Sequence, residues 1–432
     1  MNEIQTSLDA DGVLLARIDM PGRSMNVFSQ ALMDALDALI DRAQTDSAIR
    51  AVVLTSGKSS FLAGADLDMI RMFTERAQID NHAQRVELCG RLGRIFRRLE
   101  MSTTPFVAAI NGLALGGGLE VCMACHARIV ADDPDLQLGL PEIKLGLLPG
   151  AGGTQRLPRL IGAEKGLAML LSGQPVGARE AMALGLVEAV VAPDQLLVAA
   201  TQRALALAQT PNPAPWDVPD ARFDSGPYDF KRPHVSEAIC DRLQISDYQR
   251  QHYPAYQAII DCVADGWSLA MTEACNREMD IFVDLIRDPV AGNMVRTLFL
   301  NRQRAAKAGL LAADSPLKVG DQALLPRLIG VNAEAERLGC EEPDRLLAVA
   351  LVAVQVWGEG RVGAPELADV AAVAAGVSPA YSGGPFTYLH QQGVQEVHRR
   401  AVALQGVDIE LFQVPDALER FFAAQQVATH GA

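Results

Sequence analysis

The sequence is poor in basic residues and has no long hydrophobic run. Its 432 residues include 38 Lys and Arg against 52 Asp and Glu, which gives a formal net charge of −14. Nucleic-acid binding requires a basic surface, so this balance argues against it, although a local basic rim could still hold an anionic ligand. The longest mostly apolar run, 346–357, has 12 residues, fewer than the roughly 20 that span a bilayer. We expect no nucleic-acid partner and no transmembrane segment.

Signals for export, disulfides and metal binding are also lacking. The first residues, MNEIQTSLDADG, have neither a basic start nor an apolar core, unlike a signal peptide. The seven cysteines are scattered and odd in number, which favours reduced thiols over a disulfide framework. Outside residues 122–126, the histidines show no metal-ligand spacing. We expect a cytoplasmic protein without a metal site.

Periodicity predicts an α/β first half. Hydrophobic residues make up 49% of the chain, enough for a sizeable core. Short apolar runs at 13–20, 51–56 and 105–110 are typical of strands, and helical patterns such as 29–44 lie between them. Ser29 is a candidate N-cap for that helix. Alternation of this kind is typical of an α/β fold with crossover helices.

The remainder of the chain is mostly helical by pattern. A proline-rich segment at 210–233 predicts a wrapping loop. No proline occurs between 290 and 311, which predicts a long connecting helix there. After the turn-like segment 313–321, helical patterns continue to 432, with an interruption at 376–386.

The most unusual local pattern places an acid inside an apolar stretch, in INGLALGGGLEVCM at 110–123. Three glycines, 116–118, let backbone approach closely, and the free N–H groups at a following helix start would stabilise an oxyanion. Glu120 falls in the first turn of that helix. A solvated helix-start acid is the simplest interpretation, but burial among apolar neighbours favours a paired carboxylate or one with a raised pKa and a function.

Two further segments carry possible partners for Glu120. Glu142 lies in LGLPEIKLGLLPGAGG, and a loop acid on its own is normally solvated. The PGAGG portion lacks both the G-x-G-x-x-G spacing and a Walker lysine, which argues against a phosphate loop. The AGAD of SSFLAGADLDMI is either a tight turn or the source of a second backbone N–H, at Ala65, facing that of Gly117.

Together these segments resemble the signature regions of the enoyl-CoA hydratase/isomerase, or crotonase, family, over residues 1 to about 260. GRSMNVFS at 22–29 and NMVRTLFLNRQRAAKAG at 293–309 resemble the opening loop and linker helix of that family's multifunctional fatty-acid oxidation α-subunits. The resemblance implies a spiral of β-turn-β-α units that binds a CoA thioester through two backbone amides.

The resemblance also implies roles for individual residues. The oxyanion hole falls on the N–H groups of Ala65 and Gly117, and the two catalytic acids fall on Glu120 and Glu142. Water activation is assigned chiefly to Glu120, and protonation of C2 to Glu142. Family members that act only as isomerases commonly keep just the second acid. Positions that match substrate and CoA contacts are Met25, Leu62, Ala63, Gly64, Asp66, Leu67, Gly116 and Pro141.

The implied activity is hydration of 2-enoyl-CoA in fatty-acid β-oxidation, with CoA as part of the substrate rather than a cofactor. One alternative is Δ3,Δ2-enoyl-CoA isomerisation at the same site. Another is a non-catalytic acyl-CoA-binding or scaffold subunit, for example one that docks a thiolase. A homo-oligomer is a further possible assembly.

The C-terminal third resembles the helical part of 3-hydroxyacyl-CoA dehydrogenases, through residues 359–389. However, the sequence has no strand–GxGxxG–helix pattern, and an apolar LVAVQ at 351–355 replaces that family's usual Asn/Glu-Ala stretch. We therefore expect no NAD and no dehydrogenase activity. The domains expected on this basis are a crotonase core at 1–205, a wrapping segment with completing helices at 206–285, a linker helix at 286–312 and a helical domain at 313–432.

Residues 122–126, CMACH, match the C-x-x-C-H pattern of covalent haem attachment. The stretch is apolar, and the chain shows no export signal, whereas haem attachment normally needs an exported, accessible segment. We interpret the string as helix packing.

Overall fold

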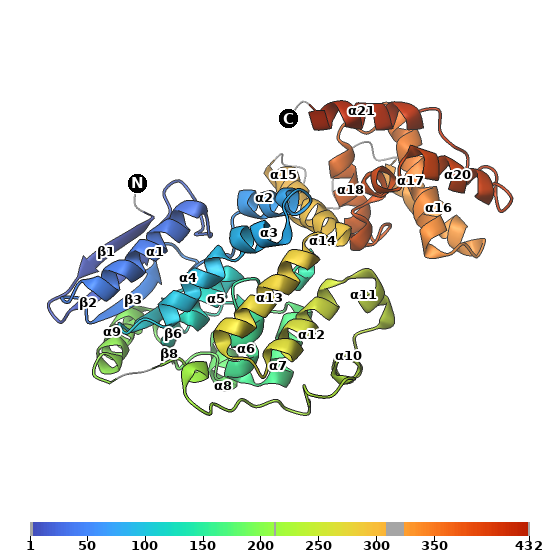
Figure 1. Cartoon of the computed structure of the whole chain (residues 1–432). Helices are drawn as coiled ribbons and strands as arrows, with labels where there is room; N and C mark the ends of the chain where they lie inside the picture. Colours follow the sequence, from blue (N-terminus) through green and yellow to red (C-terminus); the bar gives the residue numbers. More distant parts are fainter. Residues whose placement is uncertain (1–2, 211–212, 308–323, 431–432) are drawn as a thin grey trace. The chain divides into compact units, whose positions relative to one another are not determined.

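The computed structural model describes residues 3–210, 213–307 and 324–430. The chain divides into two compact units, Met1–Asp288 and Pro289–Ala432, and each is treated by itself. The first unit is built on a six-stranded mixed sheet with the order β1-β2-β3-β4-β6-β8. The first two strands are antiparallel and the others are parallel (Figure 1). The strands are β1 (Ile4–Leu8), β2 (Val13–Ile18), β3 (Ala51–Ser56), β4 (Phe106–Ile110), β6 (Ala127–Ala131) and β8 (Ala189–Val191).

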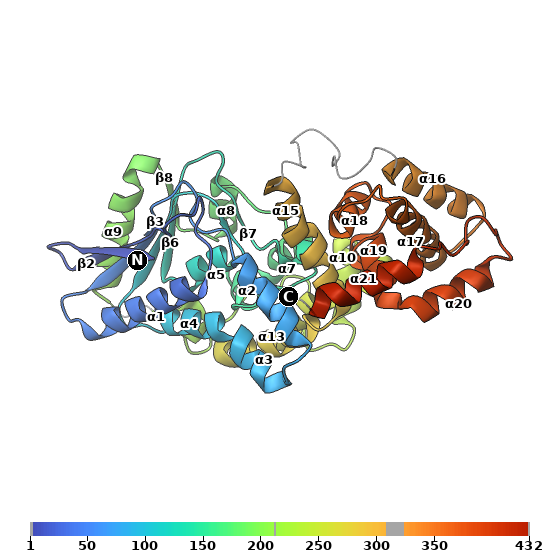
Figure 2. The ribbon, with the colours of Figure 1, turned by 90° about the horizontal axis from the view of Figure 1, so that it is seen from above.

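The central strands are apolar on both faces because helices cover both sides of the sheet. On one side, side chains such as Val53 and Val107 pack against Ala200 and Ala204 of α9 (Leu196–Leu207). Figure 2 shows the opposite side covered by α1 (Gln30–Thr45), α4 (Arg91–Glu100) and α5 (Gly117–Ala124). The predicted strands within 13–20, 51–56 and 105–110 are confirmed.

Local signals also set the start of α1 and the course of the proline-rich segment. The Ser29 hydroxyl accepts a hydrogen bond from the N–H of Leu32 at 3.2 Å, so the predicted N-cap is confirmed. Apart from the short 3-10 turn η3 (Pro215–Asp217), the described part of 210–233 is a loop. It runs past α8 (Ala178–Leu184) and α7 (Ala163–Ser172) to α10 (Val235–Leu243) (Figure 1). The Ala163 N–H donates to Asp224 O at 2.8 Å and ties this loop to the helices.

The rest of the first unit is helical. Its α-helices are α2 (Leu67–Ala77), α3 (His82–Cys89), α6 (Gly153–Ile161), α7 (Ala163–Ser172), α8 (Ala178–Leu184), α10 (Val235–Leu243), α11 (Asp247–His252), α12 (Ala255–Gly266) and α13 (Met271–Leu285). Two further 3-10 turns are η1 (Glu142–Leu145) and η2 (Pro193–Gln195). A second, two-stranded parallel sheet pairs β5 (Ala114–Leu115) with β7 (Leu138–Gly139).

In the described residues of the second unit, helices joined by turns and loops are present, without strands. The expected connecting helix is present as α14 (Pro289–Met294), a π-helical stretch η4 (Val295–Asn301) and α15 (Arg302–Lys307). Thr297 in the π-helical stretch donates its hydroxyl to Gly383 O at 2.8 Å, within the same unit. Residues 308–323, with the expected boundary at 312 and the turn-like segment 313–321, lie outside the described residues. The other elements are α16 (Leu324–Arg337), α17 (Glu342–Gly358), α18 (Pro365–Ala374), η5 (Ala380–Ser382), α19 (Pro385–Gln392), α20 (Val394–Leu404) and α21 (Leu418–His430).

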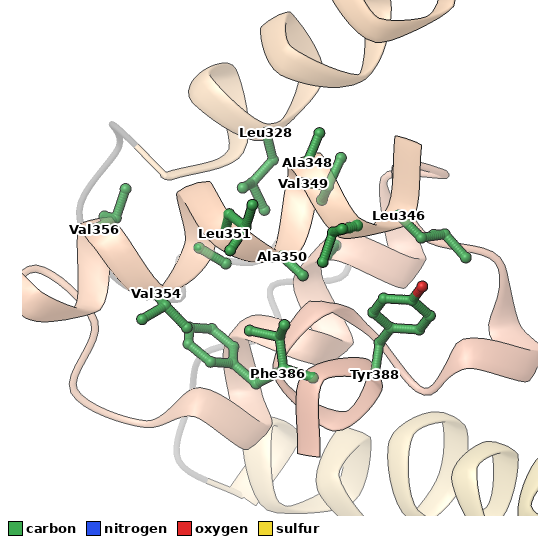
Figure 3. Close-up of a cluster of buried hydrophobic side chains, with 14 of the residues drawn as sticks. Leu328, Leu346, Ala348, Val349, Ala350, Leu351, Val354, Val356, Phe386 and Tyr388 are labelled. Atoms are coloured by element: carbon green, nitrogen blue, oxygen red, sulfur yellow. The ribbon is translucent and has the colours of Figure 1, made fainter. Parts of the chain in front are cut away.

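The longest apolar run of the sequence forms the centre of the second unit. Figure 3 shows α17 with Leu351 and Val354 packed among side chains that include Leu328 and Phe386. Because α17 is surrounded by neighbouring helices, it is apolar on most of its faces. In the parts of the chain that the structure describes, no helix is both long and apolar enough to cross a membrane.

Candidate active site

The three segments singled out by their sequence lie together. Leu62 bridges to Ala114, and its carbonyl accepts from the N–H of Leu115 at 3.0 Å. The strand of Ala114 pairs in turn with β7, and the Gly116 N–H continues this pairing to Gly139 O at 2.9 Å. Backbone hydrogen bonds therefore join the turn after β3, the loop after β4 and the approach to Glu142.

Two backbone N–H groups in these segments have no acceptor. Phe28 receives a hydrogen bond from Asp66 N and donates to Gly64 O, so the N–H of Ala65 between them points away from Phe28. Gly117 is the first residue of α5, where an N–H has no intrahelical acceptor. Among the hydrogen bonds of the described residues, neither Ala65 N nor Gly117 N donates. Both are available to a ligand oxygen.

Glycine is required where these segments touch. Gly116 has φ of +54°, and a Cβ there would lie 2.6 Å from Glu142 Oε1 and 3.6 Å from the Cα of Gly64. A Cβ on Gly118 would lie 2.2 Å from Leu62 O. Side chains at these two positions would push apart the segments that carry Ala65, Gly117 and Glu142.

Glu120 lies on α5, is 3% exposed and is anchored through one oxygen. Its Oε1 accepts from Ala151 N at 2.8 Å and from Gly153 N at 2.7 Å. Burial raises the pKa of Glu120, while the two N–H donors and the nearby Arg156 oppose that rise. Oε2 takes part in none of the hydrogen bonds of the described residues and is free to accept a proton.

Glu142 opens the turn η1 and has the more strongly perturbed pKa of the two acids. Its residue is partly exposed, yet its Oε2 is buried and, among the described residues, has no hydrogen-bond partner. Burial, followed by the charge of Glu120, raises the pKa of Glu142 well above its usual value. A pKa raised in this way favours the protonated form of the carboxyl group, which suits a proton donor.

A third buried carboxylate, Glu278 of α13, was not predicted from the sequence. Its Oε1 accepts from Gly152 N at 2.6 Å, and its Oε2 accepts from Thr154 N at 3.0 Å and from the Thr154 hydroxyl. Burial and then the charge of Glu120 raise the pKa of Glu278 to about 8. A sequence signal existed: Glu278 lies seven residues from both Met271 and Leu285, on the buried stripe of α13.

A buried ion pair supports the same backbone segment. The guanidinium of Arg156, which is fully buried, donates to both oxygens of Glu100 at 2.8 and 3.0 Å. It also donates to Ala151 O at 2.7 Å. Among the described residues, no group of three His, Cys, Asp or Glu is placed to hold a metal ion.

The expected CoA-contact positions fall into two groups. Met25 is 47% exposed, and Ala63 and Pro141 are partly exposed, so their side chains are accessible. Gly64 and Gly116 lie where the backbone after β3 approaches the backbone that leads into α5. Leu62 is fully buried, where it holds the segment in place.

Asp66 and Leu67 lie at the start of α2. The Asp66 carboxylate accepts from Asp68 N at 2.9 Å and lies 2.6 Å from the guanidinium of Arg23. It therefore caps the helix and fixes the opening loop. The side chain of Leu67 lies outside the described residues.

Asn26, also absent from the expected residues, holds the opening loop against this segment. Its side-chain amide donates to Ile18 O and Phe61 O, and its Oδ1 accepts from Met20 N, with distances of 3.0 to 3.2 Å. Because Asn26 is fully buried, these bonds fix the segment 26–28, whose backbone is hydrogen-bonded to residues 63–66.

The Cys-x-x-Cys-His string has structural partners. Cys122 and Cys125 are buried, and burial raises the pKa of Cys125 to about 12. His126 accepts from Phe106 N through Nδ1, so its Nε2 carries the proton and donates to Ser102 O at 3.2 Å. These contacts support the interpretation of the string as packing.

Comparisons with known proteins identify a family and several relatives. The enoyl-CoA hydratase/isomerase family model matches residues 10–215. The fatty acid oxidation complex subunit alpha of Idiomarina loihiensis is 34% identical over 313 residues, which cover 72% of this chain and 43% of that protein. The fatty acid oxidation complex subunit alpha of Shewanella amazonensis is 35% identical over 320 residues, which cover 73% of this chain and 43% of that protein. The chain thus spans less than half the length of these relatives, and the similarity extends beyond the family model.

The solved structure of Pseudomonas aeruginosa DspI is 34% identical in sequence to this chain. The matched region covers 49% of this chain and 82% of DspI, with a TM-score of 0.42. The family match confirms the expected α/β fold of the first unit, which an all-helical second unit follows. The chain belongs to the enoyl-CoA hydratase/isomerase, or crotonase, family.

Proposed function

We propose that this chain adds water across the C2=C3 bond of 2-enoyl-CoA thioesters. The observation that carries the proposal is the pairing of two acids of raised pKa, Glu120 and Glu142, with the two free N–H groups of Ala65 and Gly117. The two acids differ in their surroundings, because N–H donors anchor one oxygen of Glu120, whereas Oε2 of Glu142 has no hydrogen-bond partner among the described residues. Such a difference suits one base and one proton donor.

The proposed reaction begins with the thioester oxygen accepting from Ala65 N and Gly117 N. This polarises C3, where a water oxygen forms the new C–O bond while Glu120 takes one proton from that water. The electron pair of the double bond moves to an enolate, whose negative oxygen the two N–H groups stabilise by about 3 kcal/mol each. Protonated Glu142 then gives its proton to C2. Both acids return to their starting protonation states when a proton passes from Glu120 to Glu142 through solvent.

Δ3,Δ2-isomerisation is a second candidate activity of the same site. It requires one base that moves a proton between C4 and C2, again through an enolate held by the two N–H groups. The free, buried Oε2 of Glu142 favours this candidate, since one carboxylate with an unpaired oxygen is sufficient for the transfer.

The proposal also includes a pathway and a role for the second unit. Because the homologous proteins are named as fatty acid oxidation subunits, we assign the substrate to fatty-acid β-oxidation. We assign the second unit a structural role without NAD, since its core is built from the apolar α17.

The role of the Gly117 N–H is tested by replacing Gly117 with proline and with alanine. Proline is tolerated at the first residue of a helix but removes the N–H, so we expect kcat for hydration to fall by about 10²- to 10³-fold. Alanine keeps the N–H and adds a Cβ about 3.1 Å from the Phe28 ring, so it controls for the added bulk. Steady-state assays on a 2-enoyl-CoA compare the two. Equal kcat values for both variants would contradict the role given to this N–H.

A further inference from the structure

The backbone at the start of α6 is shared by two carboxylates. Successive N–H groups from Ala151 to Thr154 point in alternate directions: those of Ala151 and Gly153 reach Glu120, and those of Gly152 and Thr154 reach Glu278. One peptide segment therefore lies between two acids that come from α5 and α13. A shift of this segment toward either acid changes the hydrogen bonds of the other.

Packing of the segment is incomplete on the Glu278 side. A cavity of about 190 Å³ lies there, and its lining includes Gly150, Gly152, Cys275, Glu278 and Met279. Glycines 150 and 152 contribute no side chains to fill it. The bonds from Gly152 N, Thr154 N and the Thr154 hydroxyl to Glu278 therefore fix the segment together with the bond from Arg156 to Ala151 O.

We propose that Glu278 is a positioning residue for Glu120, an inference that rests on the proposed function. By holding Gly152 and Thr154, Glu278 keeps the N–H groups of Ala151 and Gly153 directed at Glu120 Oε1. That leaves Glu120 Oε2 aimed at the reacting water. Because the segment lies between Glu278 and Glu120, Glu278 acts on the reacting water only through Glu120.

The test replaces Glu278 with glutamine and measures kcat and KM separately. Glutamine keeps the shape and one acceptor oxygen, but its NH2 group cannot accept from the Thr154 N–H. The segment then shifts, and a displacement near 1 Å costs about 10- to 100-fold in kcat. We expect KM for the 2-enoyl-CoA to stay within about twofold, because Ala65, Gly117 and the opening loop keep their own contacts.

Asp369 of α18 provides a matched control in the second unit. Its buried carboxylate accepts from Phe386 N, Thr387 N and the Thr387 hydroxyl. These are the same kinds of donor as at Glu278, namely two backbone N–H groups and one threonine hydroxyl. Both Glu278→Gln and Asp369→Asn should lower the melting temperature, since each leaves a buried N–H without an acceptor. Only Glu278→Gln should lower kcat.

A second pair of variants serves if Glu278→Gln does not fold. Thr154→Val removes the hydroxyl donor to Glu278 and keeps the side-chain shape, whereas Thr154→Ser keeps the hydroxyl. We expect the valine variant to lose more kcat than the serine variant, with KM alike in the two. Equal kcat values in this pair, or a Glu278→Gln variant with wild-type kcat, would overturn the positioning role while leaving the proposed function standing. A wild-type protein without turnover would overturn the proposed function, and the positioning role with it.

Discussion

Replacing both Glu120 and Glu142 with glutamine should lower kcat for hydration of a 2-enoyl-CoA by at least about 10³-fold, given that one positioned acid or base contributes about 10²- to 10⁴-fold. Glutamine keeps the size of each side chain and can still accept from Ala151 N and Gly153 N at position 120. The double variant therefore removes proton transfer while preserving the hydrogen bonds that shape the site. Two residues that act in one step are not additive, so the double loss should resemble the larger single loss.

The single variants distinguish the two candidate activities. Glu142→Gln should reduce both hydration of 2-enoyl-CoA and isomerisation of 3-enoyl-CoA, because hydration needs its proton and isomerisation needs its carboxylate to move a proton from C4 to C2. Glu120→Gln should reduce hydration far more than isomerisation, because only hydration must activate water. Glu180, an exposed carboxylate on α8, provides a control through Glu180→Gln. Turnover of the double variant equal to that of the wild type and of Glu180→Gln would contradict the assignment of the acid pair.

Arg156→Met should lower the free energy of unfolding by about 3–5 kcal/mol, the usual effect of breaking a buried ion pair by removing one partner. Arg156 and Glu100 are both buried and share two hydrogen bonds. In Arg156→Met, the Glu100 carboxylate therefore keeps Arg97, at 2.8 Å, as its ion-pair partner among the described residues. It also leaves Ala151 O without the Arg156 donor. Urea denaturation of wild type and variant measures the difference.

The double variant Glu100→Gln, Arg156→Met controls for lost packing. Since it also removes the buried Glu100 charge, which has lost its Arg156 partner in the single variant, it should recover part of the stability that Arg156→Met loses. A single variant as stable as the wild type, or a double variant no more stable than the single one, would show that the pair does not contribute to stability as proposed.

The parts of the fold that the sequence predicted are those set by local patterns. The strands β2, β3 and β4 follow from short apolar runs, and α1 follows from its periodicity with Ser29 as cap. The burial of Glu120 was predicted from its apolar sequence neighbours, because a helix segment with an apolar surface is normally buried. The π-helical turns of η4 were not foreseen, because a change from i→i+4 to i→i+5 bonding leaves no clear mark on apolar spacing.

The supporting residues of the site escaped prediction because their partners are distant in sequence. Glu278 binds residues more than 120 positions away, and Asn26 reaches from the opening loop to Phe61. Nothing local indicates which buried backbone groups such side chains will meet. The position of Glu278 on the apolar stripe of α13 signalled a buried acid but not its partner.

The most direct test of the account is the rate at which the purified protein consumes crotonyl-CoA and a long-chain 2-enoyl-CoA, followed by the loss of the conjugated thioester absorbance. Hydration predicts that the absorbance of at least one substrate falls and that the 3-hydroxyacyl-CoA accumulates in equal amount. It also predicts that the Glu120→Gln, Glu142→Gln variant shows neither change. Binding of both thioesters without any loss of absorbance by the wild-type protein would contradict the account and favour a non-catalytic acyl-CoA-binding protein.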